Sequence, residues 1–180
     1  MRRKELEHIL RSASVIAGDS EVLIVGSQSI LGTFDETELP DAAHASIEVD
    51  VTFFDDPDNV KSDTVDMYIG EDSTFHVQFG YYAQGVDLTT AMLPSGWGER
   101  IVPYTGPGAN GATGHCLDAH DLVVSKLVAY REKDFEFAHA LLQAGLVEPD
   151  VLIERAMLLP VPAKRQSVVS WVLAWKKKYQ

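Results

Sequence analysis

The chain has 180 residues, of which 46% are hydrophobic and 23% are charged, a composition typical of one globular domain rather than a disordered segment. Its formal net charge of -12 disfavours non-specific binding to DNA or RNA, because such binding depends on Lys and Arg displacing phosphate counterions. No stretch approaches the roughly 20 apolar residues of a membrane helix, no secretory core follows Met1, and Cys116 is the single cysteine, so we expect a cytoplasmic protein with a plain buried thiol.

The first part of the chain predicts a helix followed by a buried strand. Apolar side chains recur at helical spacing over about residues 3–17, and Gly18 would end that helix. The continuous apolar run 22–25 predicts a strand that is buried on both faces, and it is broken by Gly26. Ser27 can then begin a short helix or turn.

An acid-rich segment separates this turn from the clearest strand of the sequence. Residues 33–45 contain several acids and Pro40, which is typical of an exposed loop. In residues 46–54, apolar and polar side chains alternate with the two-residue period of a half-buried strand. Glu48 and Asp50 should therefore project from the same face, about 7 Å apart along the strand.

The middle of the chain predicts further short elements joined by glycine-rich turns. The expected elements are a helix at 58–69, strands at 75–79, 86–92 and 100–104, and a bend at 80–85. Glycines then recur over residues 106–114, which predicts a flexible connector acting as a hinge or lid. A phosphate-loop interpretation of this segment is disfavoured because the Gly-Lys-Ser/Thr ending is absent.

The last third of the chain has the periodicity of helices. Asp118 can cap a helix that continues towards Tyr130, and a second helical stretch stops at Gly145. Two shorter helices are expected at about 149–158 and 163–177, with prolines between them.

The order of these elements predicts an α/β (mixed α+β) fold. We expect a small mixed twisted sheet with flanking helices over residues 1–105. A helical C-terminal segment, residues 115–180, should pack on that sheet to form a single compact unit.

Three carboxylates and one glycine-serine turn carry the chemistry that the sequence suggests. Nucleotidyl transfer requires cations that neutralise a triphosphate and carboxylates that hold those cations. Mg²⁺ prefers oxygen ligands, and Glu48, Asp50 and Asp87 would supply them if their strands are neighbours. At Gly26 and Ser27, backbone N–H groups and a hydroxyl can approach a phosphate. The alternatives are a solvated sheet face and a purely structural turn.

At these residues the sequence resembles the nucleotidyltransferases of the polymerase-β-like superfamily, and among them small bacterial proteins akin to the abortive-infection toxin-antitoxin group. The first part of the superfamily pattern is a hydrophobic residue, Gly, and then Gly or Ser, which is present here as Val25-Gly26-Ser27. The second part alternates acidic and hydrophobic residues, and it is present as Glu48-Val49-Asp50-Val51. Asp87 resembles the third carboxylate of the superfamily. The similarity covers about residues 20–145.

The resemblance extends into the helical half of the chain. Residues 118–134 resemble a helical element of that subgroup, which contains Lys-Leu-x-Ala followed by Arg and then Lys-Asp. In the subgroup, the lysine of Lys-Leu-x-Ala contacts the nucleotide phosphates. The match implies that Lys126 contacts the phosphates and that Arg131, Lys133 and Asp134 support it. A solvated helix lysine is the alternative interpretation of Lys126.

The resemblance implies a metal-dependent nucleotidyltransferase that moves a nucleotidyl group from a nucleoside triphosphate to an acceptor. Mg²⁺ or Mn²⁺ would be held by Glu48, Asp50 and Asp87, and the catalytic set would be Asp50, Asp87 and Lys126. Asp87 would also help to deprotonate the acceptor hydroxyl. The acceptor stays open among a tRNA end, a protein hydroxyl and a small molecule.

Two departures from the superfamily pattern keep other functions open. Glu48 stands where Asp is usual, and the interval after Ser27 is longer than usual. Glu48 favours a catalytically degenerate nucleotidyltransferase-like protein that acts as an antitoxin or regulatory binding module, or one that binds nucleotide without turnover. Asp50, Asp87 and Lys126 are intact and favour the enzyme. Apolar side chains expected on the last helix could contact the partner protein of a toxin-antitoxin pair, although core packing is their commoner use. These side chains are Val168, Val169, Trp171, Val172 and Trp175.

Overall fold

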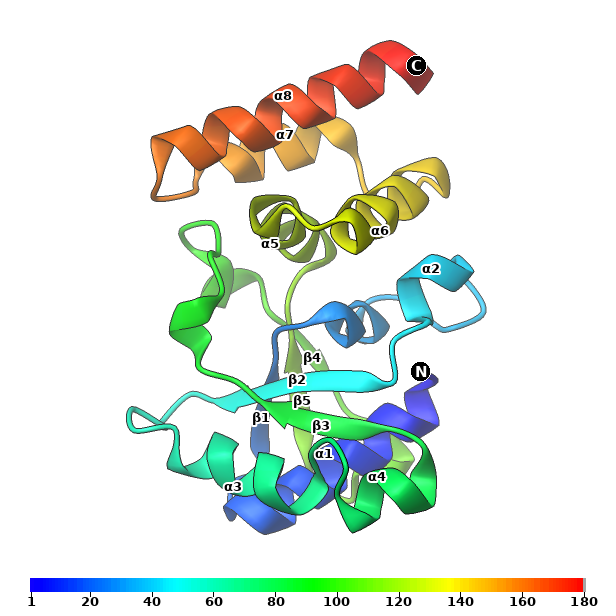
Figure 1. Cartoon of the computed structure of the whole chain (residues 1–180), viewed down its shortest axis with the longest axis vertical. Coiled ribbons are helices and arrows are strands. Elements are labelled where there is room, and N and C mark those ends of the chain that lie inside the picture. Colours follow the sequence, from blue (N-terminus) through cyan, green and yellow to red (C-terminus); the bar gives the residue numbers. More distant parts are fainter. Residues whose placement is uncertain (180) are drawn as a thin grey trace.

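The computed structural model describes residues 1–179 and has a mixed α/β architecture, in which helices flank a five-stranded sheet and form the C-terminal half (Figure 1). The helices are α1 (Arg3–Ala17), α2 (Asp41–His44), α3 (Val60–Ile69), α4 (Thr74–Phe79), α5 (Ala119–Ala129), α6 (Glu132–Gln143), α7 (Pro149–Met157) and α8 (Pro162–Tyr179). The strands are β1 (Glu21–Ile24), β2 (Glu48–Phe53), β3 (Tyr82–Gly85), β4 (Val102–Tyr104) and β5 (Thr113–Cys116). Short 3₁₀ helices are η1 (Ser27–Gly32), η2 (Leu88–Thr90), η3 (Trp97–Arg100) and η4 (Pro107–Ala109). None of the helices described within residues 1–179 is long and apolar enough to cross a membrane.

The sheet is mixed, and β1 lies at its centre. The strand order is β3-β2-β1-β5-β4; β1 pairs antiparallel with β2 and parallel with β5, while β2 pairs parallel with β3. Figure 1 shows α1, α3 and α4 on one side of the sheet and helices α5 to α8 on the other. Residues 22–24 are fully buried, which confirms the expectation of a strand covered on both faces.

The two ends of the chain follow the helical patterns of the sequence. In α1 the inward side chains Leu6, Ile9 and Leu10 are fully buried, and Gly18 ends the helix in the left-handed conformation with φ 64°. Asp118 caps α5, since its carboxylate accepts hydrogen bonds from two backbone N–H groups of the first turn. On the last helix, Val168, Val172 and Trp175 are buried, so these side chains pack in the core.

Residues 75–79 form helix α4 rather than the expected strand. The hydroxyl of Ser73 caps this helix by accepting a hydrogen bond from the His76 N–H at 3.1 Å. Phe75 and Phe79, four residues apart, bring their ring centroids to 4.8 Å, which is possible on one face of a helix. A short apolar run fits both the period of a helix and the period of a strand, and here the serine cap favours the helix.

Strand β3 occupies the segment expected as a bend, and the expected strand at 86–92 is mostly irregular chain with η2. Gly85 belongs to β3, where a Cβ atom would lie 2.0 Å from the carbonyl oxygen of Ser62 on α3. This glycine therefore permits the close approach of a helix to the sheet and does not mark a bend. Regular pairing ends soon after it, with the hydrogen bond from the Val86 N–H to the Val51 carbonyl oxygen at 2.9 Å.

The glycine-rich segment 106–114, expected as a flexible connector, contains η4 and the start of β5 and packs against α1. Glu7 of α1 is only 8% exposed and accepts hydrogen bonds from the Tyr104 hydroxyl at 2.8 Å and the Gly108 N–H at 2.9 Å. A Cβ atom at Gly106 would lie 2.0 Å from the Oε1 atom of Glu7. Glycine is thus needed in this segment to make room for a buried carboxylate.

Two boundaries expected from the sequence also shift. Strand β5 belongs to the sheet, so the sheet part continues beyond residue 105, where we expected it to end. Residues 33–45 are not wholly an exposed loop, because they contain α2, which packs against α6. Leu39 and Ala43 are consequently buried. The thiol of Cys116, as expected, is buried and free.

Candidate functional site

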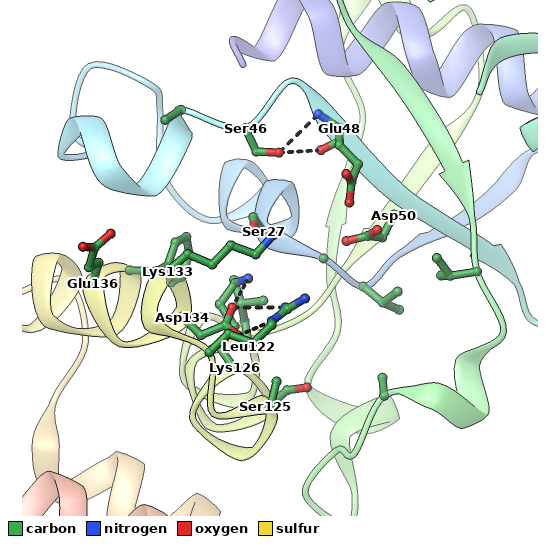
Figure 2. Close-up of a pocket in the computed structure, with 18 of the residues that line it drawn as sticks. Ser27, Ser46, Glu48, Asp50, Leu122, Ser125, Lys126, Lys133, Asp134 and Glu136 are labelled. Carbon is green, nitrogen blue, oxygen red and sulfur yellow. Dashed lines mark hydrogen bonds and ion pairs between the residues drawn. The ribbon is translucent and has the colours of Figure 1, made fainter. Parts of the chain in front are cut away.

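One cleft of about 730 Å³ lies between the sheet and helices α5 and α6, a size suited to a nucleotide or another small ligand (Figure 2). It gathers nearly all the residues that the sequence singled out, drawn from the turn after β1, from β2 and from the two helices. These residues are Gly26, Ser27, Glu48, Asp50, Lys126, Arg131, Lys133 and Asp134. Segments far apart in the sequence therefore meet in this cleft.

The glycine of the turn after β1 is in contact with the central acid of the cleft. A Cβ atom at Gly26 would lie 1.6 Å from the Oδ2 atom of Asp50, and the Val25 N–H donates to the Asp50 carbonyl oxygen at 3.1 Å. The φ of Gly26 is -92°, which any residue can adopt, so glycine is required here by space and not by conformation. The turn and the acid form one packed unit.

The two acids of β2 lie side by side in the cleft. Glu48 and Asp50 project from one face of the strand, as their alternation predicted, and Figure 2 shows their carboxylates next to each other. Burial, followed by the negative charge of Glu48, raises the pKa of Asp50 to about 6. The charges of Lys126 and Arg131 act in the opposite direction but do not cancel this effect. A pair of crowded carboxylates of this kind is suited to a cation.

Lys126 lies in the wall of the cleft and is not a solvated helix lysine. Its side chain is 11% exposed, and its Nζ atom lies 3.3 Å from the Oδ1 atom of Asp134 and 4.9 Å from the centroid of the Phe137 ring. Burial lowers the pKa of Lys126, whereas the charge of Asp134 acts to raise it. The ammonium is thus held in place by a buried carboxylate and an aromatic face.

Asp134 also pairs with a second cation of the cleft. Its carboxylate accepts hydrogen bonds from Arg131 at 2.6 Å and 3.2 Å. Burial alone would raise the pKa of Asp134, but the hydrogen bonds from Arg131 and the charge of Lys126 hold it below its usual value. One buried acid therefore fixes two cations that face the acids of β2.

Lys133 is an exposed cation of the cleft and, unlike Lys126 and Arg131, is not held by Asp134. Among residues 1–179 it has no carboxylate partner within ion-pair distance, whereas Lys126 and Arg131 share Asp134. Figure 2 shows the Lys133 side chain extending from α6 across the cleft towards Ser27. Its charge is available to a ligand without the loss of an existing ion pair.

Asp87 does not join the acids of β2, which corrects the expected set of three metal ligands. It lies two residues beyond the end of β3, and its neighbour Val86 lines the cleft while Asp87 does not. The Asp87 carboxylate accepts a hydrogen bond from the Thr89 N–H at 2.8 Å and caps η2, and this bond lowers the pKa of Asp87. Within residues 1–179, Asp87 is therefore not grouped with Glu48 and Asp50 as a set of three metal ligands.

No other residue takes the place of the third acid. The residue of β3 that is in register with Asp50 is Gln84. In the part of the chain that the structure describes, residues 1–179, no three His, Cys, Asp or Glu side chains are grouped so as to hold a metal ion by themselves. A divalent ion held by Glu48 and Asp50 would need further oxygen ligands, such as those of a bound molecule or of water.

Tyr82, Ser125 and Glu136 were not predicted from the sequence to lie at the site. Ser125 and Glu136 line the cleft from α5 and α6, and the Tyr82 hydroxyl donates a hydrogen bond to the Oε2 atom of Glu48 at 3.0 Å. The pairing of β2 with β3 brings Tyr82 beside Glu48. This contact could be found from the sequence only by placing the third strand at residues 82–85, where we expected a bend.

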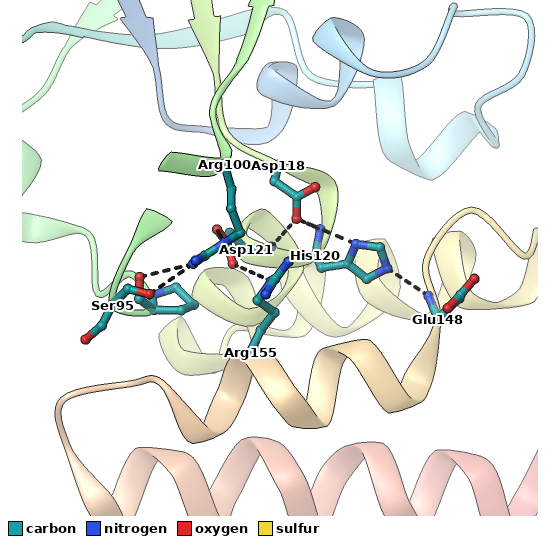
Figure 3. Close-up of polar contacts among 8 residues, drawn as sticks. Ser95, Arg100, Asp118, His120, Asp121, Glu148 and Arg155 are labelled. Carbon is teal, nitrogen blue, oxygen red and sulfur yellow. Dashed lines mark hydrogen bonds and ion pairs between the residues drawn. The ribbon is translucent and has the colours of Figure 1, made fainter. Parts of the chain in front are cut away.

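On its other side, α5 is fixed by a buried cluster of charges (Figure 3). Asp121 is fully buried, and its carboxylate oxygens lie 2.8 Å from the Nε atom of Arg100 and 3.3 Å from the Nε atom of Arg155. The contact with Arg155 is an ion pair without the alignment of a hydrogen bond. Arg100 also donates to the Ser95 carbonyl oxygen at 3.1 Å. The cluster joins the loop before β4 to α5 and α7, and so holds the helix that carries Lys126.

Comparison with known proteins identifies a nucleotidyltransferase family. A family model described as a nucleotidyltransferase of unknown function (DUF6036) matches residues 4–177. No curated protein and no solved structure shows detectable similarity to the chain.

Proposed function

Because the chain belongs to the DUF6036 family of nucleotidyltransferases of unknown function, we propose that its cleft binds a nucleoside triphosphate with Mg²⁺ or Mn²⁺ and transfers the nucleotidyl group to an acceptor hydroxyl. The observation that carries this proposal is the meeting of a glycine-serine turn, two crowded carboxylates and three cations in one cleft. These are the groups needed to bind a polyanion together with a divalent cation.

The phosphates would lie between the turn after β1 and the helices α5 and α6. Gly26 and Ser27 offer backbone N–H groups and a hydroxyl there, since the turn lies at the rim of the cleft. Lys126 would neutralise phosphate charge from a fixed position, because Asp134 holds it. Lys133 extends towards the same turn and would add a mobile charge.

The acids of β2 fit a divalent cation that shares its ligands with the triphosphate. Mg²⁺ in nucleotide sites is commonly held by one or two carboxylates, while substrate phosphates and water complete its coordination. Glu48 and Asp50 would provide those carboxylates. Burial and the charge of Glu48 raise the pKa of Asp50 to about 6 despite the opposing charges of Lys126 and Arg131, so a cation between the two acids would relieve their repulsion. When bound, the cation would neutralise charge that develops on the phosphates.

A second candidate function is favoured by the position of Asp87. With its carboxylate outside the cleft, the sheet contributes two acids where the superfamily pattern has three. A catalytically degenerate protein that binds nucleotide without turnover, and that acts as an antitoxin or regulatory binding module, agrees with this arrangement. Binding of a triphosphate without any transfer of its label would support this candidate over the enzyme.

We expect a nucleoside triphosphate with Mg²⁺ or Mn²⁺ to raise the melting temperature of the protein. A ligand that binds only the folded state adds RT ln(1 + [L]/Kd) to its stability, which is about 2.7 kcal/mol at a hundredfold excess over Kd. A thermal-shift series with ATP, GTP, CTP and UTP, each with and without metal, measures the effect. The absence of a shift in every combination would contradict both candidate functions.

Replacing Lys126 with alanine is expected to weaken nucleotide binding by about ten- to a hundredfold, because a charge-assisted contact with the phosphates is lost. The fold should persist, since Arg131 continues to pair with Asp134. Isothermal titration calorimetry with the triphosphate that gives the largest thermal shift measures the change.

The control for this prediction is Lys164→Ala, which removes a lysine of α8 outside the cleft. The Nζ atom of Lys164 donates to the Val128 carbonyl oxygen at 3.1 Å. Its loss should leave nucleotide affinity unchanged. If Lys126→Ala also binds nucleotide with wild-type affinity, the role assigned to Lys126 is wrong.

A further inference from the structure

Tyr82 is placed beside one of the two acids of the cleft by the pairing of β2 with β3. Glu48 and Tyr82 are partners in this parallel register, so their side chains lie on the same face of the sheet. The Tyr82 hydroxyl donates to the Oε2 atom of Glu48 at 3.0 Å. The tyrosine is 6% exposed, and its ring lies against His76 with centroids 4.6 Å apart. The hydroxyl is therefore presented to Glu48 by a ring that is itself held in place.

This hydroxyl acts as a donor throughout the physiological pH range. A tyrosine phenol keeps its proton at neutral pH, since its ordinary pKa is about 10, so the hydroxyl at 3.0 Å from Oε2 donates to the Glu48 carboxylate. A neutral donor holds the carboxylate oxygen in place without adding a positive charge to the pair of acids. The pair of acids thus keeps its attraction for a cation.

Glu48 needs such a contact more than an aspartate would. A glutamate has one more rotatable side-chain bond than an aspartate, and fixing its carboxylate costs more conformational entropy. Repulsion between the two carboxylates would also turn the Glu48 side chain away from Asp50 if nothing held it. The hydrogen bond from Tyr82 opposes both effects by holding Oε2 at the strand.

We propose that Tyr82 is a positioning residue that holds the Glu48 carboxylate beside Asp50 for a divalent cation, and so compensates for a glutamate where the superfamily pattern has aspartate. This inference rests on the proposed function, since it assigns Glu48 to cation binding. Tyr82 does not line the cleft, and it acts through Glu48 alone.

The test is Tyr82→Phe, which removes the hydroxyl and keeps the ring against His76. Melting temperatures are measured over a Mn²⁺ titration at a fixed concentration of the triphosphate that gives the largest shift with the wild-type protein. We expect the Mn²⁺ concentration needed for half of the shift to rise about tenfold, the loss that corresponds to one hydrogen bond to a charged group. The melting temperature without ligand should change little.

The matched control is Tyr81→Phe, because Tyr81 also loses a hydroxyl hydrogen bond in this variant, but one that lies outside the cleft. The Tyr81 hydroxyl and the Nδ1 atom of His8 are 2.8 Å apart. This variant should keep the Mn²⁺ requirement of the wild-type protein. A similar rise in both variants, or a Tyr82→Phe value within twofold of wild type, would overturn the inference while the wild-type shift still supports nucleotide binding.

A double-mutant cycle shows whether Tyr82 acts through Glu48. The shorter side chain of Glu48→Asp cannot keep the contact with the tyrosine hydroxyl, so adding Tyr82→Phe to it should raise the Mn²⁺ requirement no further. An equal rise in both backgrounds would assign the hydroxyl another role and overturn the inference. If the wild-type protein itself shows no metal-dependent shift with any triphosphate, the proposed function and this inference both fail.

Discussion

Replacing Asp50 with asparagine is expected to reduce nucleotidyl transfer by at least about a hundredfold, because an amide cannot supply the charge that holds a divalent cation. The same substitution should stabilise the ligand-free protein at neutral pH. Burial, and then the charge of Glu48, raises the pKa of Asp50 to about 6, which shows that folding opposes its charged form. Transfer of label from an α-labelled triphosphate measures the loss, and urea denaturation measures the gain.

The gain in stability should depend on pH. Above about pH 6 the Asp50 carboxylate is charged in both the folded and the unfolded protein, so the wild type bears the full cost of a buried charge. The cost falls between about pH 6 and pH 4, and below about pH 3 the carboxyl group is neutral in both states. Asp50→Asn should therefore exceed the wild type by roughly 1–3 kcal/mol near pH 7.5 and match it near pH 3.

Asp87→Asn is the control, because it removes a carboxylate that lies outside the cleft. An asparagine can still accept the hydrogen bond from the Thr89 N–H that Asp87 accepts at 2.8 Å. This variant should keep wild-type transfer and gain no stability at neutral pH. Transfer by Asp50→Asn at the wild-type rate would exclude Asp50 from the cation site. A loss of transfer in Asp87→Asn as large as that in Asp50→Asn would contradict the position assigned to Asp87.

Truncation of Asp121 to alanine is expected to lower the free energy of unfolding by about 3–5 kcal/mol. Asp121 is fully buried and is the shared ion-pair partner of Arg100 and Arg155, whose side chains are 20% and 25% exposed. The substitution leaves both guanidinium groups without that partner in a poorly solvated position. Urea denaturation of the variant and the wild type near pH 7 measures the difference.

An exposed ion pair of the same helical half provides the control for Asp121→Ala. The carboxylate of Asp150 is 77% exposed and lies 2.5 Å from the Nζ atom of Lys176. Asp150→Ala should cost less than about 1 kcal/mol, since water solvates both charges after the pair is broken. A cost of that small size for Asp121→Ala would contradict the view that the buried cluster holds α5 in place.

The parts of the fold that follow from local patterns could be predicted from the sequence. The two-residue alternation around Glu48 and Asp50 gave the correct face for both acids, and helical spacing gave α1 and the helices after Asp118. These patterns are long enough to distinguish the 3.6-residue period of a helix from the two-residue period of a strand. The secondary structure predicted for residues 75–92 was wrong because the elements of this segment are short. The apolar residues at 75–79 fit either a helix or a strand. Gly85 is needed for the close contact between β3 and α3, and it does not form a bend.

The third acid shows why a candidate site needs the exact position of a strand. Side chains alternate between the two faces of a sheet, and which residues of neighbouring strands lie side by side depends on where each strand is placed. Because β3 covers residues 82–85 and not 86–92, Asp87 follows the strand and Tyr82 becomes the partner of Glu48. Gly26 and Ser27 could be assigned without this information, since they directly follow a strand that the sequence defines well.

The charges of the cleft are divided between the two parts of the chain. The sheet part contributes Glu48 and Asp50, whereas Lys126, Arg131 and Lys133 all come from α5 and α6. A fragment that ended before α5 would keep both carboxylates and would repel the anion that the whole chain is proposed to bind. During synthesis, affinity for a triphosphate would therefore arise only after the first two C-terminal helices had left the ribosome and docked on the sheet.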